Sequence, residues 1–323
     1  MKVLVTGAAG FLGSHLTEKL VESGFDVRVL VHYDSNNNWG WLENSIYKKN
    51  IEFVVGDIRD FDSVYSAMQD IDEVFHLAAL IGIPYSYLSP LAYIKTNIEG
   101  TYNILQSAKL LKTKNILITS TSETYGSAQY IPIDENHPKV GQSPYSATKI
   151  GADSLAESFY RSFGLPIKIV RPFNIYGPRQ SARAIIPSIC IQILNGINEI
   201  KLGNTNTTRD LTFVKDTAMG FIKISREETL NGESTNIGMN NEVSIKNLVE
   251  KISTILNKKI NIITDQERVR PDKSEVTRLV CDNSKIKKFT DWDPEYNLDK
   301  GLRETIEWIE QNKTLFKHEI YNQ

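Results

Sequence analysis

The fold of this chain is decided by residues 3–13, which read VLVTGAAGFLG. A short β-branched run leads into three glycines, and a stretch with helical spacing of leucines follows. In a strand–turn–helix unit, Gly7 permits the tight turn, Gly10 lets a pyrophosphate approach the backbone, and Gly13 lets the helix pack closely on the sheet. The helix N-terminus attracts phosphate. The segment therefore predicts a dinucleotide-binding turn, and the alternative is a glycine turn without a ligand.

Outward from this turn, strand-like and helix-like segments alternate through the first half of the chain. We expect strands at residues 3–6, 27–31, 51–55, 73–77, 115–119 and 167–170. Strands that alternate with helices form right-handed βαβ units. The pattern therefore predicts an α/β fold with a Rossmann-type, doubly wound parallel sheet.

Beyond Arg171 the alternation loosens. Loops rich in Gly, Asn and Pro occupy residues 174–180 and 203–209, and helical stretches occur among them. The length suggests two domains. We expect an NAD(P)-binding domain at residues 1–172. Residues 173–323 would form mainly a smaller C-terminal lobe that completes a cleft, with the chain crossing back to the first domain around residues 210–240.

The composition excludes several classes of protein. The 323 residues include 37 Lys and Arg against 39 Asp and Glu, a net charge of −2, whereas nucleic-acid-binding domains are usually basic. Cys190 and Cys281 are the only cysteines and lie in no ligand cluster, so we expect no metal. There is no signal-peptide pattern, and the apolar run 184–194 is too short to span a bilayer. We expect a cytoplasmic protein with no nucleic-acid or membrane partner.

The end of the second strand bears on the choice between NAD and NADP. An acidic residue usually stands there and binds the ribose 2′-hydroxyl, but this chain has Val31 and His32. Without a carboxylate a 2′-phosphate is not repelled, and His32 and Ser35 can donate hydrogen bonds to it. We therefore favour NADP, with NAD as the alternative because Asp34 can bend back to a ribose. Asp57, after the third strand, is placed to meet the adenine amino group, or else caps a helix.

A tyrosine and a lysine stand four residues apart in Tyr145-Ser-Ala-Thr-Lys149. On a helix both side chains project from one face. Tyrosine, with a pKa near 10, is a poor base at neutral pH, and a nearby lysine cation lowers that pKa. Lys149 can also hold the nicotinamide ribose. Together with the glycine turn, this spacing predicts that Tyr145 and Lys149 belong to a catalytic centre.

These motifs resemble those of the extended short-chain dehydrogenase/reductases that act on nucleotide sugars. The shared features are the three glycines, residues 76–79, 96–97, 100–101 and 119–126, the Tyr–Lys pair, and residues 171–179, 209–216 and 270–272. The resemblance implies an NAD(P) that stays tightly bound and is regenerated in each turnover. The resemblance also implies that the cofactor is contacted by Phe11, Leu12, Ile58, Leu77, Ala78 and Ala79. It also implies a homodimer formed through a four-helix bundle, with helices that start near Pro90 and Tyr145.

The segment Ser120-Thr-Ser-Glu-Thr-Tyr-Gly126 distinguishes subclasses of this family. The 4-epimerases carry no carboxylate at the position of Glu123, whereas 4,6-dehydratases carry Thr-Asp-Glu or Thr-Ser-Glu, as Thr121, Ser122 and Glu123 do here. Oxidation at C4 of the sugar acidifies the C5 hydrogen, so a positioned base can remove it and water can leave from C6. Such acid–base assistance contributes roughly 10²- to 10⁴-fold in rate. The resemblance thus implies a hydro-lyase in which Thr121, Glu123, Tyr145 and Lys149 are catalytic.

Three other functions remain open. UDP-glucuronate decarboxylases also carry Thr-Ser-Glu and need a cation for the substrate carboxylate, which Arg183 can provide. A nucleotide-sugar 4-epimerase and a non-catalytic dinucleotide-binding sensor are the others. One further stretch, residues 31–42 with Trp39 and Trp41, resembles bacterial UDP-N-acetylglucosamine 4,6-dehydratases of legionaminic acid synthesis. It favours UDP-N-acetylglucosamine as the substrate.

The second lobe is expected to hold the nucleotide sugar. Arginine suits a pyrophosphate because its planar guanidinium makes bidentate contacts. The resemblance favours Arg209 and Arg270, and Arg179 is a further candidate. We expect the remaining substrate contacts from Tyr85, Ser122 and Asn174.

Overall fold

The computed structural model of the chain describes residues 1–269 and 271–317. The strands are β1 (Lys2–Thr6), β2 (Asp26–Val31), β3 (Ile51–Val55), β4 (Glu73–His76), β5 (Asn115–Thr119), β6 (Ile167–Pro172), β7 (Asn174–Tyr176), β8 (Glu199–Leu202), β9 (Thr208–Phe213), β10 (Ser234–Ile237), β11 (Glu242–Ser244), β12 (Asn261–Thr264) and β13 (Arg278–Leu279). The helices are α1 (Phe11–Glu22), α2 (Phe61–Ala67), α3 (Ile83–Leu88), α4 (Pro90–Tyr93), α5 (Gly100–Leu111), α6 (Pro144–Phe163), α7 (Ile185–Leu194), α8 (Val214–Arg226), α9 (Ile245–Leu256), α10 (Ser284–Phe289) and α11 (Leu298–Gln311). None of these helices is both long and apolar enough to cross a membrane.

The main sheet confirms the predicted α/β fold. Within the described residues it has seven strands in the order β10-β6-β5-β4-β1-β2-β3, and every neighbouring pair is parallel. Its central strands are buried along almost their whole length, as in β4 and β6. Strands covered on both faces have this continuous burial, because neither face meets water.

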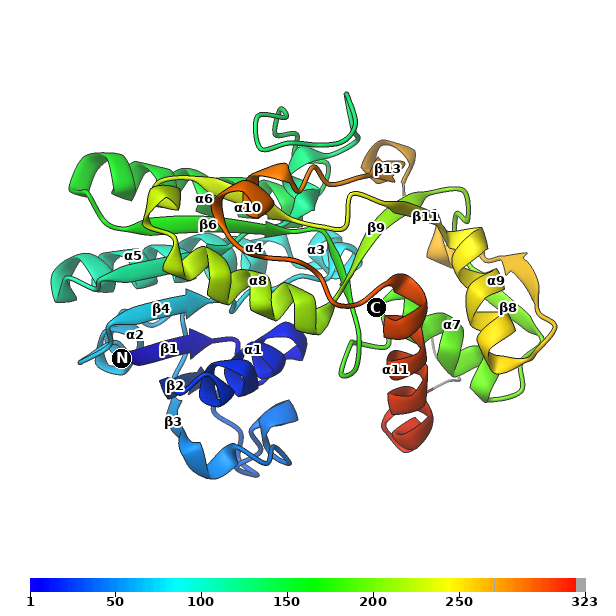
Figure 1. The fold of residues 1–323 in the computed structure, drawn as a ribbon, viewed down its shortest axis with the longest axis horizontal. Coiled ribbons are helices and arrows are strands. Elements are labelled where there is room, and N and C mark those ends of the chain that lie inside the picture. Colours follow the sequence, from blue (N-terminus) through cyan, green and yellow to red (C-terminus); the bar gives the residue numbers. More distant parts are fainter. Residues whose placement is uncertain (270, 318–323) are drawn as a thin grey trace.

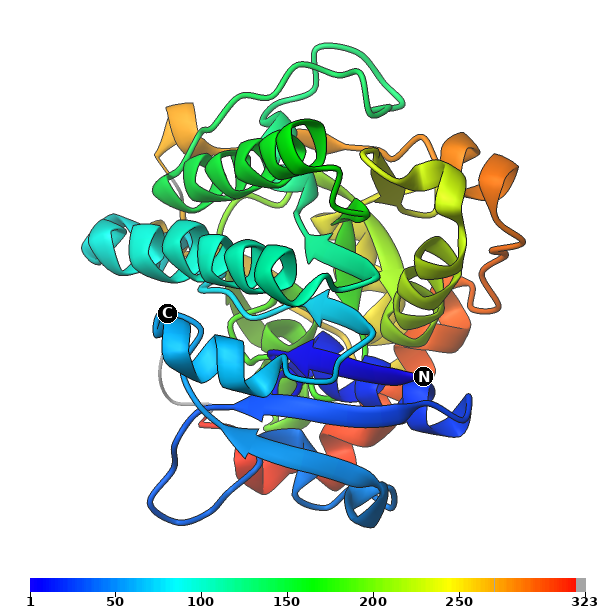
Figure 2. The ribbon, with the colours of Figure 1, turned by 90° about the vertical axis from the view of Figure 1, so that its left-hand side faces the viewer.

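Helices cover both faces of this sheet. On one face α1 and α8 pack together, and Leu16, Leu20 and Phe221 belong to the core beneath them. On the other face α2, α5 and α6 enclose a second core that contains Ile104 and Phe159. Figure 2 shows α5 in cyan and α6 in green running side by side over the sheet.

Helix α6 is defined sharply at both ends by its sequence. Ser143 is its N-cap and forms a capping box with Ser146, and Pro144 occupies the first helical position. Gly164 ends the helix with a left-handed backbone at φ +67°. These signals fix the register of α6, so that Tyr145 and Lys149 face the protein interior.

The second half of the chain builds a smaller lobe and also returns to the main sheet. Strands β11, β9 and β13 form a second sheet, with β7 against β9. Helices α7, α9 and α11 share a core with it, and α7, α9 and β8 lie on the right of Figure 1. Between these elements, α8 packs on α1 and β10 pairs with β6. The chain therefore crosses back to the first sheet between residues 214 and 237.

Candidate active site

The glycine turn connects β1 to α1 as a close-packed backbone cradle. Gly7 has φ +72°, and a Cβ there would lie 2.7 Å from the backbone nitrogen of Ala78. A Cβ on Gly13 would lie 2.1 Å from the carbonyl oxygen of Gly7. The amide of Gly10 donates a 3.1 Å hydrogen bond to that same oxygen. A cradle that excludes side chains, at the N-terminus of α1, fits the pyrophosphate of a dinucleotide.

The neighbouring strand end is fixed by a buried histidine. Nδ1 of His76 lies 2.8 Å from Oγ1 of Thr6, and Nε2 lies 3.2 Å from Oγ1 of Thr101. Burial lowers the pKa of His76 to about 3, so its imidazole is neutral. Because Thr6 also accepts a 3.2 Å hydrogen bond from the amide of Ala78, this network holds residues 77–79 beside the glycine turn.

The residues expected at the adenosine end lie after β2 and β3. His32 and Ser35 are exposed, and the carboxylate of Asp34 accepts a 2.7 Å hydrogen bond from the amide of Asn36. The carboxylate of Asp57 pairs with the Arg59 guanidinium at 2.5 Å, which lowers the pKa of Asp57.

Tyr145 and Lys149 are buried one turn apart on α6. Nζ of Lys149 donates a 2.5 Å hydrogen bond to the carbonyl oxygen of Thr119, at the end of β5. Burial lowers the pKa of Lys149 to about 8. Burial also raises the pKa of Tyr145, and hydrogen bonding with the Thr121 side chain opposes that rise. The pKa of Tyr145 is therefore raised and not lowered as the Tyr–Lys spacing predicts, because the loss of solvation dominates.

Glu123 is held by the short helical turn η4 (Ser122–Tyr125) that follows β5. Thr121 caps this turn, and its Oγ1 accepts a 3.2 Å hydrogen bond from the amide of Glu123. Ser122 is buried. The negative charge of Glu123 contributes to the raised pKa of Tyr145, and the turn η4 packs against α6, which carries Tyr145. The structure thus brings Thr121, Glu123, Tyr145 and Lys149 together at the carboxyl end of β5.

Aromatic residues lead from this centre to the protein surface. The ring of Tyr93 lies 6.3 Å from that of Tyr145, and the ring of Tyr85 lies 6.1 Å from that of Tyr93. Tyr85, on α3, is 44% exposed. Nη1 of Arg183 lies against Gly82, only 2.1 Å from where a Cβ on that glycine would be. The guanidinium of Arg183 therefore lies beside the row of tyrosine rings that leads from Tyr145 to the surface.

The residues expected to bind the nucleotide are less closely gathered. Arg179 forms two hydrogen bonds with the carboxylate of Glu18 on α1, at 2.9 and 3.0 Å. Arg209 on β9 is buried, and its Nη2 lies 3.4 Å from Oε1 of Glu275. Oδ1 of Asn174 is buried without a hydrogen-bond partner among the described residues. Arg270 lies outside the residues that the structure describes.

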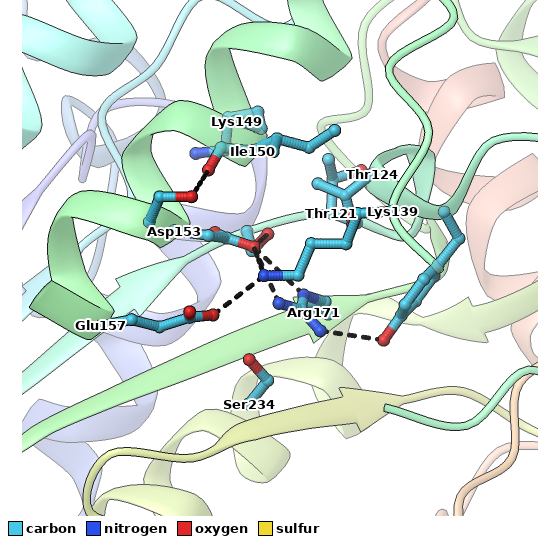
Figure 3. A network of polar contacts seen from close by, with 12 residues as sticks. Thr121, Thr124, Lys139, Lys149, Ile150, Asp153, Glu157, Arg171 and Ser234 are labelled. Carbon is cyan, nitrogen blue, oxygen red and sulfur yellow. Dashed lines mark hydrogen bonds and ion pairs between the residues drawn. The ribbon is translucent and has the colours of Figure 1, made fainter. Parts of the chain in front are cut away.

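Sequence reasoning missed the ion pair behind the candidate centre. Asp153 and Arg171 are buried, with Nη2 of Arg171 2.9 Å from Oδ2 of Asp153 (Figure 3). The one available signal was that Asp153 stands eight residues after Tyr145, on the same helical face. Its partner comes from β6, a pairing that only the fold reveals.

Comparison with known proteins establishes the family. Fold and site define the class of extended short-chain dehydrogenase/reductases that act on nucleotide sugars, as the sequence predicts. A family model described as GDP-mannose 4,6 dehydratase matches residues 4–305, so the chain belongs to this family.

Its relatives carry different activities in their names. The chain is 32% identical to a UDP-N-acetyl-alpha-D-glucosaminuronate decarboxylase of Bacillus cytotoxicus, covering 96% of this chain and 98% of that protein. It is 33% identical to a UDP-glucuronate 4-epimerase of Thermodesulfobacterium geofontis, covering 97% and 98%. The structure of the dTDP-glucose 4,6-dehydratase DesIV from Streptomyces venezuelae, solved with NAD bound, superposes with a TM-score of 0.87 at 27% identity. That match covers 98% of this chain and 99% of DesIV.

Proposed function

We propose that the protein is a nucleotide-sugar 4,6-dehydratase that converts UDP-N-acetylglucosamine to a UDP-4-keto-6-deoxy sugar. The observation that carries this proposal is the carboxylate of Glu123, held after β5 near Tyr145. Elimination across C5 and C6 requires a base beside the oxidation site, whereas epimerisation at C4 does not. The stretch with Trp39 and Trp41 supports this substrate, and with it a place in legionaminic acid synthesis.

The roles of the four residues follow from their positions. NAD(P), when bound, would supply the hydride chemistry at C4 and C6. Tyr145 removes the proton from O4 while Thr121 hydrogen-bonds to that oxygen, and Lys149 holds the nicotinamide ribose. The C4 ketone acidifies C5, so Glu123 removes the C5 proton. Glu123 then protonates the departing C6 hydroxyl, because Ser122 is not a strong acid.

The second lobe supplies the contacts with the nucleotide in this proposal. Arg209 and Arg270 bind the pyrophosphate. Arg179 forms an ion pair with Glu18 that connects the second lobe to α1. The unpartnered Oδ1 of Asn174 is available to a sugar or ribose hydroxyl. Tyr85 borders the sugar. Residues 1–172 would then form the cofactor domain and residues 173–323 mainly the substrate lobe.

The test is incubation of the purified protein with UDP-N-acetylglucosamine and analysis by mass spectrometry. We expect a product that has lost one water, with no net consumption of added cofactor. UDP-glucose and dTDP-glucose, tested in parallel, define the preferred sugar and base. A product of unchanged mass with an inverted C4 centre would instead identify a 4-epimerase.

A second candidate function is action on a nucleotide uronate, as a UDP-glucuronate decarboxylase. The observation that favours it is the position of the Arg183 guanidinium, which lies against Gly82 and beside the tyrosine rings that lead to Tyr145. That cation can pair with a C5 carboxylate. Release of carbon dioxide from UDP-glucuronate, abolished by Arg183→Ala, would establish this activity in place of dehydration.

We propose NADP as the favoured cofactor. Asp34 is engaged by the amide of Asn36, and His32 and Ser35 are exposed where they can meet a 2′-phosphate. The related DesIV structure, in contrast, holds NAD. Chromatography of the nucleotide released from the denatured protein decides between the two cofactors. Recovery of NAD alone would overturn this preference.

We propose a homodimer formed through α4, α5 and α6. Apolar side chains stand exposed on these elements and the segment between them, including Leu91 at 61%, Ile94 at 47% and Tyr102 at 42%. Contiguous exposed apolar surface is typical of protein interfaces. Light scattering should give twice the mass of one chain, and Leu91→Arg together with Ile94→Arg should halve it.

A further inference from the structure

Asp153 is a fully buried carboxylate behind the candidate catalytic centre. Tyr145, Lys149 and Asp153 follow each other at intervals of four residues along α6, so they share one helical face. Oδ2 of Asp153 accepts hydrogen bonds from Nε and Nη2 of Arg171, at 3.2 and 2.9 Å. Figure 3 shows this pair between α6 and β6.

The Asp153–Arg171 pair also forms hydrogen bonds with both ends of the segment that carries Thr121 and Glu123. Oγ of Ser120, just before this segment, donates a 2.9 Å hydrogen bond to Oδ2 of Asp153. At the other end, Nη1 of Arg171 donates a 3.1 Å hydrogen bond to the hydroxyl of Tyr125. The segment between residues 120 and 125 is therefore anchored on both sides to one ion pair.

All hydrogen bonds that described residues make to the Asp153 carboxylate go to one of its two oxygens, Oδ2. Its Oδ1 accepts no hydrogen bond from any described residue, and Nζ of Lys139 is 4.0 Å from Oδ2. Asp153 is the charged group that raises the pKa of Lys149 against the effect of burial. Among the described residues, His76 on β4 also interacts electrostatically with Lys149, whose charge lowers the pKa of the histidine, and Tyr145 lies one turn away on the same helix.

We propose that Asp153 is a positioning residue of the active site, which fixes the Thr121–Glu123 segment against α6 and places a buried negative charge one helical turn from Lys149. This role rests on the proposed function, because it assigns Asp153 to the support of residues that act on the sugar. Asp153 acts through Ser120, Arg171 and Lys149 and has no contact with the substrate.

The test compares the pH dependence of turnover in matched variants. In Asp153→Asn the buried charge is lost, so Lys149 deprotonates at lower pH. The alkaline limb of the kcat profile should then move down by about one pH unit or more. Asp153→Glu, which keeps the negative charge, should leave the alkaline limb at the same pH as in the wild type. The control is Glu157→Gln, which removes a carboxylate one turn further along α6 that pairs with Lys139 but not with Arg171. It should leave the limb in place.

Two further variants separate position from charge. Ser120→Ala removes one hydrogen bond without changing any charge, so kcat should fall at every pH with no movement of the limb. If Asp153→Asn does not fold because Arg171 is left buried and unpaired, Asp153→Asn with Arg171→Met removes the whole ion pair. In that double variant kcat should fall because the segment between residues 120 and 125 loses both anchors, and an unchanged kcat would overturn the positioning role.

The titration of Lys149 is also measured without substrate, by the 13Cε chemical shift in protein labelled with [13C]lysine and assigned with Lys149→Met. A lower Lys149 pKa in Asp153→Asn than in the wild type supports the proposal. An unchanged pKa, or an equal shift in Glu157→Gln, overturns it. Because this measurement needs no turnover, it decides the role of Asp153 even if no nucleotide sugar is a substrate and the proposed function fails.

Discussion

Glutamate and glutamine at position 123 differ in charge and in the ability to take a proton, while their size is the same. Glu123 is held through its backbone amide by Thr121, so the turn does not depend on the carboxylate. Glu123→Gln should therefore fold normally, bind cofactor normally and lose 100-fold or more of the dehydration rate, a magnitude on the order of that of a general base. Product analysis and cofactor titration measure the two properties. Near-normal dehydration by this variant contradicts the role of Glu123.

Two glycines in the dinucleotide turn should respond differently to the addition of a methyl group. A Cβ on Gly13 would overlap the carbonyl oxygen of Gly7 at 2.1 Å, whereas a Cβ on Gly10 would lie 3.3 Å from the same atom. Gly13→Ala should lower the thermal midpoint sharply. Gly10→Ala should fold but weaken cofactor binding at least tenfold, because the methyl group blocks the approach of the pyrophosphate. Equal thermal midpoints for the two variants would show that the turn can relax.

At the scale of elements, an aromatic contact joins the segment after β2 to the C-terminal helix. The rings of Trp41 and Trp308 lie 5.3 Å apart at 75°, and the amide of Trp41 donates a 3.1 Å hydrogen bond to Ala9 in the glycine turn. Trp41→Ala should lower the free energy of unfolding by about 1–3 kcal/mol. The control is Tyr33→Ala in the same segment, where the ring is 77% exposed, and urea unfolding should show almost no change.

The elements that the sequence predicts well are those with a local signal. Strands β1 to β6 are apolar runs between helical patterns, and they lie within two residues of their expected ends. Strand β10 was not predicted, because Ser234-Thr-Asn-Ile237 is short and polar and becomes a strand only by pairing with β6. The site follows the same rule. The Tyr145–Lys149 spacing is local, whereas the contacts of Asp153 with Arg171 and of Arg183 with Gly82 join residues far apart in the chain.

At the scale of the whole molecule, buried neutral His76 makes stability depend on acidity. Its pKa is about 3 in the folded protein against 6.5 as the ordinary value, so below pH 6.5 the unfolded chain binds a proton that the folded protein does not. This contribution to stability is complete above pH 6.5 and is lost as the pH falls toward 3. Between pH 6.5 and 5 it amounts to about 2 kcal/mol.

Urea unfolding at pH 7 and pH 5 tests this expectation. The wild type should lose more free energy of unfolding between the two pH values than His76→Asn does, by about 2 kcal/mol. His32→Asn, at an exposed position, should lose as much as the wild type. If His76→Asn and the wild type fall in parallel, another group controls the acid response.

The return of the chain to the main sheet has a consequence for protein synthesis. Strand β6 pairs on its outer side with β10. The amide of Ile169, which donates a 3.0 Å hydrogen bond to the carbonyl oxygen of Glu233, is therefore paired only when that later part of the chain is present. On the ribosome, a nascent chain that ends at residue 172 exposes an unpaired apolar edge strand, a known template for aggregation. More than sixty further residues must emerge before that edge is covered. A gene fragment for residues 1–172 would therefore encode an incomplete sheet, and translation must pass residue 237 before the seven-stranded sheet can reach its final fold.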